Sequence, residues 1–202
     1  MFKVLSVCLA IFSSGALLAS DEIPISRSSL QPGASLDWMG SKTFLLGKKG
    51  FSEGSEFPAV RLVKSEDMQE FHLKTLNKVT VITTLPSIDT PVCDEQVRTL
   101  NRQLTGKGIE VIVISRDLPY AQRRFSEVNK LQNIRFLSDY RRGEFGKLTG
   151  LEIERNGLLA RSIMVVDEKR IVRHLQIVPA IYSLPDLEKA ISVAQKIKLS
   201  NN

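Results

Sequence analysis

The sequence predicts an α/β domain built on a mixed β-sheet, and three patterns lead to this fold class. Two nearly unbroken runs of β-branched residues, at 78–85 and 109–115, are typical of central strands covered on both faces. Between them, residues 92–104 place apolar side chains at helical spacing, so that a strand, a helix and a strand follow one another. Two further runs, at 161–167 and 170–177, flank a short polar turn and indicate an antiparallel hairpin. Parallel and antiparallel strands are therefore expected in one sheet.

The surrounding segments continue the alternation of strands and helices. Residues 43–51 have apolar stretches on either side of Gly-Lys-Lys-Gly, which predicts a small N-terminal β-hairpin. Other elements are expected as short strands at 58–63 and 71–76, a helix after Pro119, a strand at 134–138, a short helix closed by Gly150 and an amphipathic helix at 185–198. No interdomain linker is visible after residue 57, so one domain is expected over residues 41–202.

Residues 1–20 have the layout of a secretory signal peptide. Lys3 precedes an apolar run, and small residues follow at Ala19 and Ser20. Serines and Gly15 interrupt the run, which is too short to span a membrane, and no later segment is long and apolar enough either. An N-terminal core helix is the alternative, but a helix this apolar needs a partner groove. We therefore expect removal of 1–20, export to the periplasm, no stable membrane insertion, and an N-terminal arm of little regular structure over residues 21–40.

Composition argues against several other classes of function. The net charge of the whole chain is +6, and its basic residues stand in scattered pairs with acidic residues nearby, so nucleic-acid binding is not expected. His72 and His174 lie far apart without ligands at metal spacing, so no metal site is expected and both histidines are interpreted as partly exposed strand residues. No phosphate-binding loop, dinucleotide fingerprint or nucleophile elbow is present, and no cofactor is expected.

The cysteine count is the most informative feature. The chain has two cysteines, and Cys8 lies in the expected signal peptide, which leaves Cys93 without an internal disulfide partner. Cys8 stands too early to follow the apolar run that lipid attachment requires. A lone cysteine in an exported protein is either a buried apolar residue or a reactive group.

The position of Cys93 favours reactivity. It falls in the first turn of the expected helix, after a central strand, where the helix dipole and unpaired N–H groups favour a thiolate. Lowering the pKa of an ordinary thiol from about 8.5 to about 6 requires about 3.4 kcal/mol. A helix dipole supplies about 1 kcal/mol. A nearby cation is therefore expected.

Residues 86–93, Pro-Ser-Ile-Asp-Thr-Pro-Val-Cys, resemble the peroxidatic motif of peroxiredoxins, in which Pro, Thr and Cys occur at this spacing. The Pro-Ser-Ile-Asp-Thr form is similar to the bacterial thiol peroxidase subgroup. The resemblance covers most of 43–198 and is carried further by residues 115–125, 136–151 and 158–168. It implies a thioredoxin-like fold, a thiol-dependent peroxidase with an antioxidant role, and a homodimer.

The resemblance assigns four catalytic residues by position. Cys93 would be the attacking thiolate, Thr90 the hydroxyl that holds the peroxide beside it, Pro86 a shield against water, and Arg161 the expected cation. These roles agree with general chemistry, since fixed donors aimed at the departing oxygen lower the barrier of such an attack. Taken singly, Thr90 reads as a helix cap, Pro86 as a turn former and Arg161 as the start of an exposed strand. Apolar residues expected beside the substrate are Ile88, Val92 and Phe125.

One position departs from the family pattern. Members usually carry a resolving cysteine in the helix after the Asp-Leu-Pro segment, and the matching residue here is Ser126. Oxidised Cys93 would therefore be a sulfenic acid without an internal thiol to condense with. This predicts a one-cysteine cycle. The reductant would be a small thiol, a thioredoxin-like protein or Cys93 of a second subunit, and the substrates would be hydrogen peroxide and organic hydroperoxides.

Two other functions remain open from the sequence. A disulfide-exchange enzyme would use the same fold, but such enzymes generally carry Cys-x-x-Cys, and Thr90 stands where the first cysteine would be. A non-catalytic redox sensor, in which oxidation of Cys93 alters a partner surface, fits the missing resolving cysteine. Sustained turnover with a supplied thiol distinguishes an enzyme from a sensor.

Overall fold

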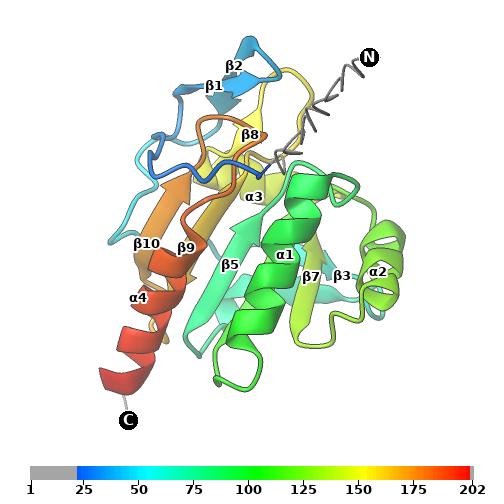
Figure 1. Cartoon of the computed structure of the whole chain (residues 1–202), viewed down its shortest axis with the longest axis vertical. Helices are drawn as coiled ribbons and strands as arrows, with labels where there is room; N and C mark the ends of the chain where they lie inside the picture. The colour runs from blue at the N-terminus through cyan, green and yellow to red at the C-terminus, as the bar shows by residue number, and fades with distance from the viewer. Residues whose placement is uncertain (1–21, 201–202) are drawn as a thin grey trace, which may run out of the picture.

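The computed structural model describes residues 22–200, so the predicted signal peptide at 1–20 lies outside the described residues. Figure 1 shows a twisted central sheet with helices packed against it. Its strands are β3 (Arg61–Lys64), β4 (Glu70–His72), β5 (Thr80–Thr84), β6 (Glu110–Ser115), β7 (Ile134–Ser138), β9 (Ser162–Val166) and β10 (Val172–Ile177). Their order across the sheet is β10-β9-β5-β6-β7-β3-β4. Strands β5, β6 and β7 are parallel and the other neighbours are antiparallel, which confirms the mixed sheet.

Helices cover both faces of this sheet. They are α1 (Pro91–Leu104), α2 (Pro119–Val128), α3 (Glu144–Thr149) and α4 (Leu187–Ser200), with a short 3₁₀ helix at Leu73–Thr75. Helices α1 and α4 lie side by side on one face (Figure 1). Two hydrophobic clusters fill the two faces, and β5 contributes Val81 to one and Ile82 to the other. The predicted apolar face of α1, Val97, Leu100 and Leu104, is buried in the first of these.

The N-terminal hairpin is confirmed, but its turn differs from the prediction. Strands β1 (Ser35–Trp38) and β2 (Ser41–Leu46) pair, and β8 (Glu152–Ile153) completes a small second sheet. The turn is Met39-Gly40, both with positive φ, and Gly40 donates a 2.6 Å hydrogen bond to the Asp37 carboxylate. The chain also turns within residues 47–50, but the expectation that this turn joins the two strands of the hairpin is wrong. Gly47 is needed there for close packing, since a Cβ on it would lie 2.4 Å from the Lys147 carbonyl oxygen.

Smaller differences occur elsewhere. β1 lies within the segment 21–40, where little regular structure was expected. The segment expected as a strand at 71–76 is β4 followed by the 3₁₀ helix. His174 is only 5% exposed, so its interpretation as a partly exposed residue is wrong: its side chain turns inward beside a β-bulge between β10 and β9 and contacts Glu53.

The topology brings residues 93 and 161 to one edge of the sheet. The parallel strands β5, β6 and β7 all end at this edge, and α1 begins there after the loop 86–90. Strand β9 runs antiparallel to β5 and starts at the same edge, with Ser162 opposite Thr84. Binding sites in such proteins commonly lie at the carboxyl ends of the parallel strands, among the loops and helix starts that meet there.

Candidate active site

Cys93 lies in the first turn of α1, as predicted. Thr90 is the extended N-cap residue, Pro91 is the first helical residue, and the Cys93 amide donates a 3.0 Å hydrogen bond to the Thr90 carbonyl. Proline suits this position because its fixed φ matches the helix and its missing N–H is not needed. The side chain of Cys93 is fully buried, with 0% exposure. The sulfur therefore lies in a closed, mostly apolar environment at the positive end of a helix.

Arg161 reaches this sulfur from the neighbouring strand. Its Nη1 lies 3.3 Å from Cys93 Sγ, within hydrogen-bonding range for sulfur. Side-chain hydroxyls at the end of β5 hold the backbone around it, since Thr83 and Thr84 donate to the carbonyls of Ser162 and Ala160. Arg161 is 2% exposed, so the alternative of an exposed strand residue is wrong. The cation expected near Cys93 is therefore the Arg161 guanidinium, which contacts the sulfur.

Gln96, which is not among the site residues predicted from the sequence, completes the surroundings of this guanidinium. Its Oε1 accepts a 2.8 Å hydrogen bond from Arg161 Nη1, and its Nε2 donates to the Thr83 hydroxyl. The Ile181 carbonyl accepts from Arg161 Nε and Nη2 at 3.2 and 2.9 Å. A polar residue three positions after Cys93, on the buried face of α1, was the available signal. A backbone carbonyl leaves no signal in the sequence.

The charge of Arg161 is not balanced by a carboxylate of the described part of the chain. None of the ion pairs within residues 22–200 involves Arg161, although its side chain is buried. Burying an unpaired charge is costly, and neutral acceptors such as Gln96 and Ile181 offset only part of that cost. The buried, unpaired charge of Arg161 therefore strongly favours an anion beside its Nη1 group.

The hydroxyl of Thr90 is buried and unused. Its Oγ1 makes no hydrogen bond with any residue that the structure describes, and α1 has no side-chain cap. Thr90 therefore occupies the N-cap position of α1, but its side chain does not cap the helix. A buried hydroxyl without a partner loses free energy relative to water. One turn from the Cys93 sulfur, such a group is suited to bind a small polar ligand.

The remaining predicted residues differ in how far they are buried. Pro86 and Ile88 are buried, and Ile88 shares a hydrophobic cluster with Cys93. Phe125 packs against the same cluster, with its ring 6.0 Å from that of Phe136. Val92 is partly exposed in the first turn of α1.

Ser126 is engaged elsewhere. Its hydroxyl donates a 3.2 Å hydrogen bond to the Leu131 carbonyl just beyond the end of α2. Within residues 22–200, no group of three or more histidines, cysteines and carboxylates is placed to hold a metal ion, and no helix is long and apolar enough to cross a membrane. Cys93 is the one cysteine among the described residues.

Comparison with known proteins agrees with this geometry. The family profile described as Redoxin matches residues 52–191. A thiol peroxidase of Clostridium acetobutylicum is 37% identical over 159 residues, which are 75% of this chain and 96% of the relative. The thiol peroxidase of Bacillus subtilis is 33% identical over 165 residues, 81% of this chain and 98% of the relative.

Solved structures agree in fold. A peroxiredoxin-like protein from Aquifex aeolicus superposes with a TM-score of 0.76 at 30% identity and covers 84% of this chain and 99% of its own. A thiol peroxidase from Chromobacterium violaceum has a TM-score of 0.74 at 21% identity, with 82% and 98% covered, and supports the fold alone. The chain therefore belongs to the redoxin family, with a thioredoxin-like fold, and within that family to the thiol peroxidases of the peroxiredoxin superfamily. It is a thiol-dependent peroxidase.

Proposed function

We propose that the enzyme reduces hydrogen peroxide and organic hydroperoxides at Cys93 through a one-cysteine cycle. In the first step the Cys93 thiolate attacks one oxygen of the hydroperoxide. An S–O bond forms, the O–O bond breaks, and the departing oxygen takes a proton and leaves as water or an alcohol. The product on the enzyme is the Cys93 sulfenic acid, and the substrate has gained the two electrons that the sulfur has lost.

One observation carries this proposal: the buried guanidinium of Arg161 contacts the Cys93 sulfur and has no carboxylate partner among the residues that the structure describes. The ionised sulfur is the natural counterion of that guanidinium, and charge-assisted contacts of this kind are stronger than neutral ones. As negative charge moves to the departing oxygen, the same fixed cation and the free hydroxyl of Thr90 offer it donors. Pro86 and Ile88 exclude water from the reacting sulfur.

The second half of the cycle requires a thiol from outside the chain. A first thiolate attacks the sulfenic sulfur, an S–S bond forms and the oxygen leaves as water. A second thiol then cleaves this mixed disulfide and restores Cys93. Ser126 supports this route because a serine cannot resolve the sulfenic acid. We propose a small thiol or a thioredoxin-like protein as the reductant, and Ile88, Val92 and Phe125 as the apolar wall beside the substrate.

Export and assembly form a separate part of the proposal. Residues 1–20 would direct the chain to the periplasm and be removed there, after which a cytosolic reductant would not reach the enzyme. The mature protein would be a homodimer. Intact mass of protein recovered from the periplasm tests the removal, and retention of residues 1–20 would exclude it. Sedimentation of the mature protein tests the dimer.

The decisive experiment is a stopped-flow reaction with hydrogen peroxide and cumene hydroperoxide, followed by intact mass. Rapid gain of one oxygen on Cys93, absent in Cys93→Ser, and continued consumption of peroxide with a supplied thiol are expected. A single equivalent consumed with no thiol able to restart the protein would favour a redox sensor. Reaction no faster than that of a free thiol would rule out the proposed cycle.

A further inference from the structure

Asp117, which the proposed cycle does not use, binds the loop that leads to Cys93. Its Oδ1 accepts a 3.0 Å hydrogen bond from the Ser87 hydroxyl, and its Oδ2 accepts one of 3.0 Å from the Ile88 amide. The Ser87 hydroxyl in turn accepts a 3.3 Å hydrogen bond from the Asp89 amide. The carboxylate thus binds two residues of the loop 86–90 directly and is connected to a third, Asp89, through the Ser87 hydroxyl.

The sheet explains why Asp117 meets this loop. Strands β5 and β6 are parallel neighbours, so the residues that follow them leave the sheet side by side. The Leu85 amide still pairs with the Ile114 carbonyl, at 3.1 Å, and the two chains separate only beyond that point. Asp117 is two residues past the end of β6, within reach of the chain that follows β5.

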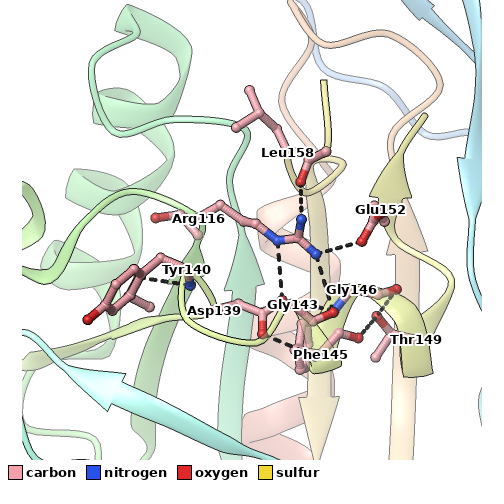
Figure 2. Close-up of polar contacts among 12 residues, drawn as sticks. Arg116, Asp139, Tyr140, Gly143, Phe145, Gly146, Thr149, Glu152 and Leu158 are labelled. Carbon is pink, nitrogen blue, oxygen red and sulfur yellow. Dashed lines mark hydrogen bonds and ion pairs between the residues drawn. The ribbon is translucent and has the colours of Figure 1, made fainter. Parts of the chain in front are cut away.

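Asp117 itself is held on a rigid base. Its carbonyl accepts from the Ser138 hydroxyl, and its neighbour Arg116 is fixed on the opposite side of the chain. Figure 2 shows the Arg116 guanidinium among acidic and carbonyl groups: its Nη2 lies 2.6 Å from the Glu152 carboxylate and its Nε 3.5 Å from that of Asp139. Arg116 also donates to the carbonyls of Gly143 and Gly157. The Asp117 carboxylate therefore reaches the loop from an anchored segment.

The loop needs such an anchor because the sulfur behind it is closed off. Cys93 is 0% exposed, and Ile88, whose amide Asp117 holds, packs in the same cluster as Cys93. A peroxide is small, whereas an attacking thiol must bring its own sulfur into line with the S–O bond of the sulfenic acid. Because Cys93 is fully buried, a neighbouring segment has to move before an external thiol reaches its sulfur, and the loop 86–90 leads directly into the helical turn that carries Cys93.

We infer that Asp117 is a positioning residue that latches the loop 86–90 beside the buried sulfur, and that opening of this latch admits the thiol reductant to oxidised Cys93. Only the second part of this inference, the admission of the thiol, rests on the proposed cycle. The closed latch keeps Thr90 and Cys93 in the arrangement that binds peroxide. The open latch exposes the sulfur. The two half-reactions therefore depend on the latch in opposite directions.

The test compares Asp117→Ala and Asp117→Asn with the full-length enzyme. Asparagine can accept from the Ile88 amide through its oxygen and donate to the Ser87 hydroxyl through its nitrogen, so it should preserve most of the latch. The matched control is Asp167→Ala, which removes a carboxylate that accepts from the Lys169 and Ile171 amides at the other edge of the sheet. It loosens a turn without touching the loop.

Three rates are measured for each protein. They are alkylation of reduced Cys93 by N-ethylmaleimide, assigned by peptide mapping; oxidation of Cys93 by hydrogen peroxide; and reaction of the sulfenic acid with the coloured thiol thionitrobenzoate. For Asp117→Ala we expect alkylation and reaction with the thiol to be about tenfold faster, as loss of one or two hydrogen bonds implies, and oxidation to be several-fold slower. Asp117→Asn should lie close to wild type, and Asp167→Ala should match it.

Unchanged alkylation in Asp117→Ala would overturn the inference, even if wild type is a fast peroxidase. Equal acceleration in Asp117→Ala and Asp167→Ala would also overturn it, because general loosening would then explain both. If wild type proves unreactive with peroxide, the proposed cycle fails, but faster alkylation confined to Asp117→Ala still supports the latch. Rate changes of the three reactions in one common direction would contradict the opposite dependence on which the inference rests.

Discussion

Gln96, three residues after Cys93 on α1, accepts a 2.8 Å hydrogen bond through its Oε1 from the guanidinium of Arg161. The same Nη1 group also contacts the Cys93 sulfur, so the amide and the sulfur share one donor group. Through its own N–H group Gln96 is tied to Thr83 in the central strand β5. The orientation of the cation toward the sulfur thus depends on the core of the sheet.

Replacement of Gln96 by leucine should therefore slow peroxide attack without removing any reacting group. The variant leaves a guanidinium N–H and the Thr83 hydroxyl with one partner fewer, so a loss of about 1–3 kcal/mol in unfolding free energy and about tenfold in oxidation rate is expected. Stopped-flow oxidation and urea unfolding measure the two. Gln176→Leu is the control, since this buried glutamine bonds Ser26 and Ser28 instead. Equal slowing in both variants would mean that the effect is general.

Arg161→Met should be the more damaging change. It removes the guanidinium that contacts the sulfur, and loss of a fixed electrostatic donor in a buried site typically lowers a rate by about a hundredfold or more. Arg161→Lys should fall between methionine and wild type, because it keeps the charge but cannot bond Gln96, Ile181 and the sulfur together. The rate of oxidation by peroxide is the measurement. If both variants oxidise as fast as wild type, Arg161 does not act on the sulfur.

Most of the scaffold of this site could be predicted from the sequence. Unbroken β-branched runs identified β5 and β6, and helical spacing identified α1, because central elements are covered on both sides and carry strong periodic signals. The position of Cys93 at the helix start followed from these elements. The contact of Arg161 did not follow from them: it required the resemblance to a family, because nothing local shows that β9 lies beside β5.

The features that the sequence did not predict depend on backbone conformation or on contacts between distant segments. The hairpin turn at Met39-Gly40 contains a methionine with positive φ, which residue type alone does not predict. Gly47, in contrast, is required by its close packing against Lys147 and not by the hairpin turn. Gln96 and Asp117 were missed because each acts through contacts between distant segments. Such contacts arise from tertiary structure, which periodicity does not record.

Thr90→Val separates capping from substrate binding. The Thr90 hydroxyl makes no capping bond, so the valine variant, which keeps the shape, should change the unfolding free energy by less than about 0.5 kcal/mol. A true cap would cost about 1 kcal/mol. Peroxide oxidation should slow at least tenfold, because the hydroxyl that donates to the peroxide is gone. Thr90→Ser should retain most of the rate. A stability loss without a change in rate would restore the capping role.

Ser126→Cys tests whether the serine is what enforces the one-cysteine cycle. The new thiol would occupy the position of the usual resolving cysteine, and its loss of the Leu131 hydrogen bond should cost little at this partly buried site. We expect oxidation by one equivalent of peroxide to end in a disulfide between residues 93 and 126, with α2 partly unwound. Intact mass and peptide mapping detect it. Persistence of a sulfenic acid in the variant would mean that the fold no longer permits the two residues to meet.

We expect the unfolding free energy to depend on pH through His174. It is buried on β10, with Nδ1 3.2 Å from Glu53 Oε1 and with Nε2 bonded to none of the residues 22–200. Burial disfavours the imidazolium and lowers the pKa of His174 below its usual 6.5; Lys189 acts in the same direction, whereas Glu53 and Asp186 oppose it. The unfolded chain therefore takes up this proton first as the pH falls.

The contribution of neutral His174 to the unfolding free energy is thus fully present above about pH 6.5. It is lost as the pH falls through the lowered pKa, by at most about 1.4 kcal/mol for each pH unit. His174→Gln cannot bind the proton, so between about pH 7.5 and about pH 5.5 it should lose less unfolding free energy than wild type. Glu53→Gln should lose more, because Glu53 opposes the lowering of the pKa. Urea unfolding at the two pH values measures all three proteins. Parallel losses in wild type and His174→Gln would assign the pH dependence to other groups.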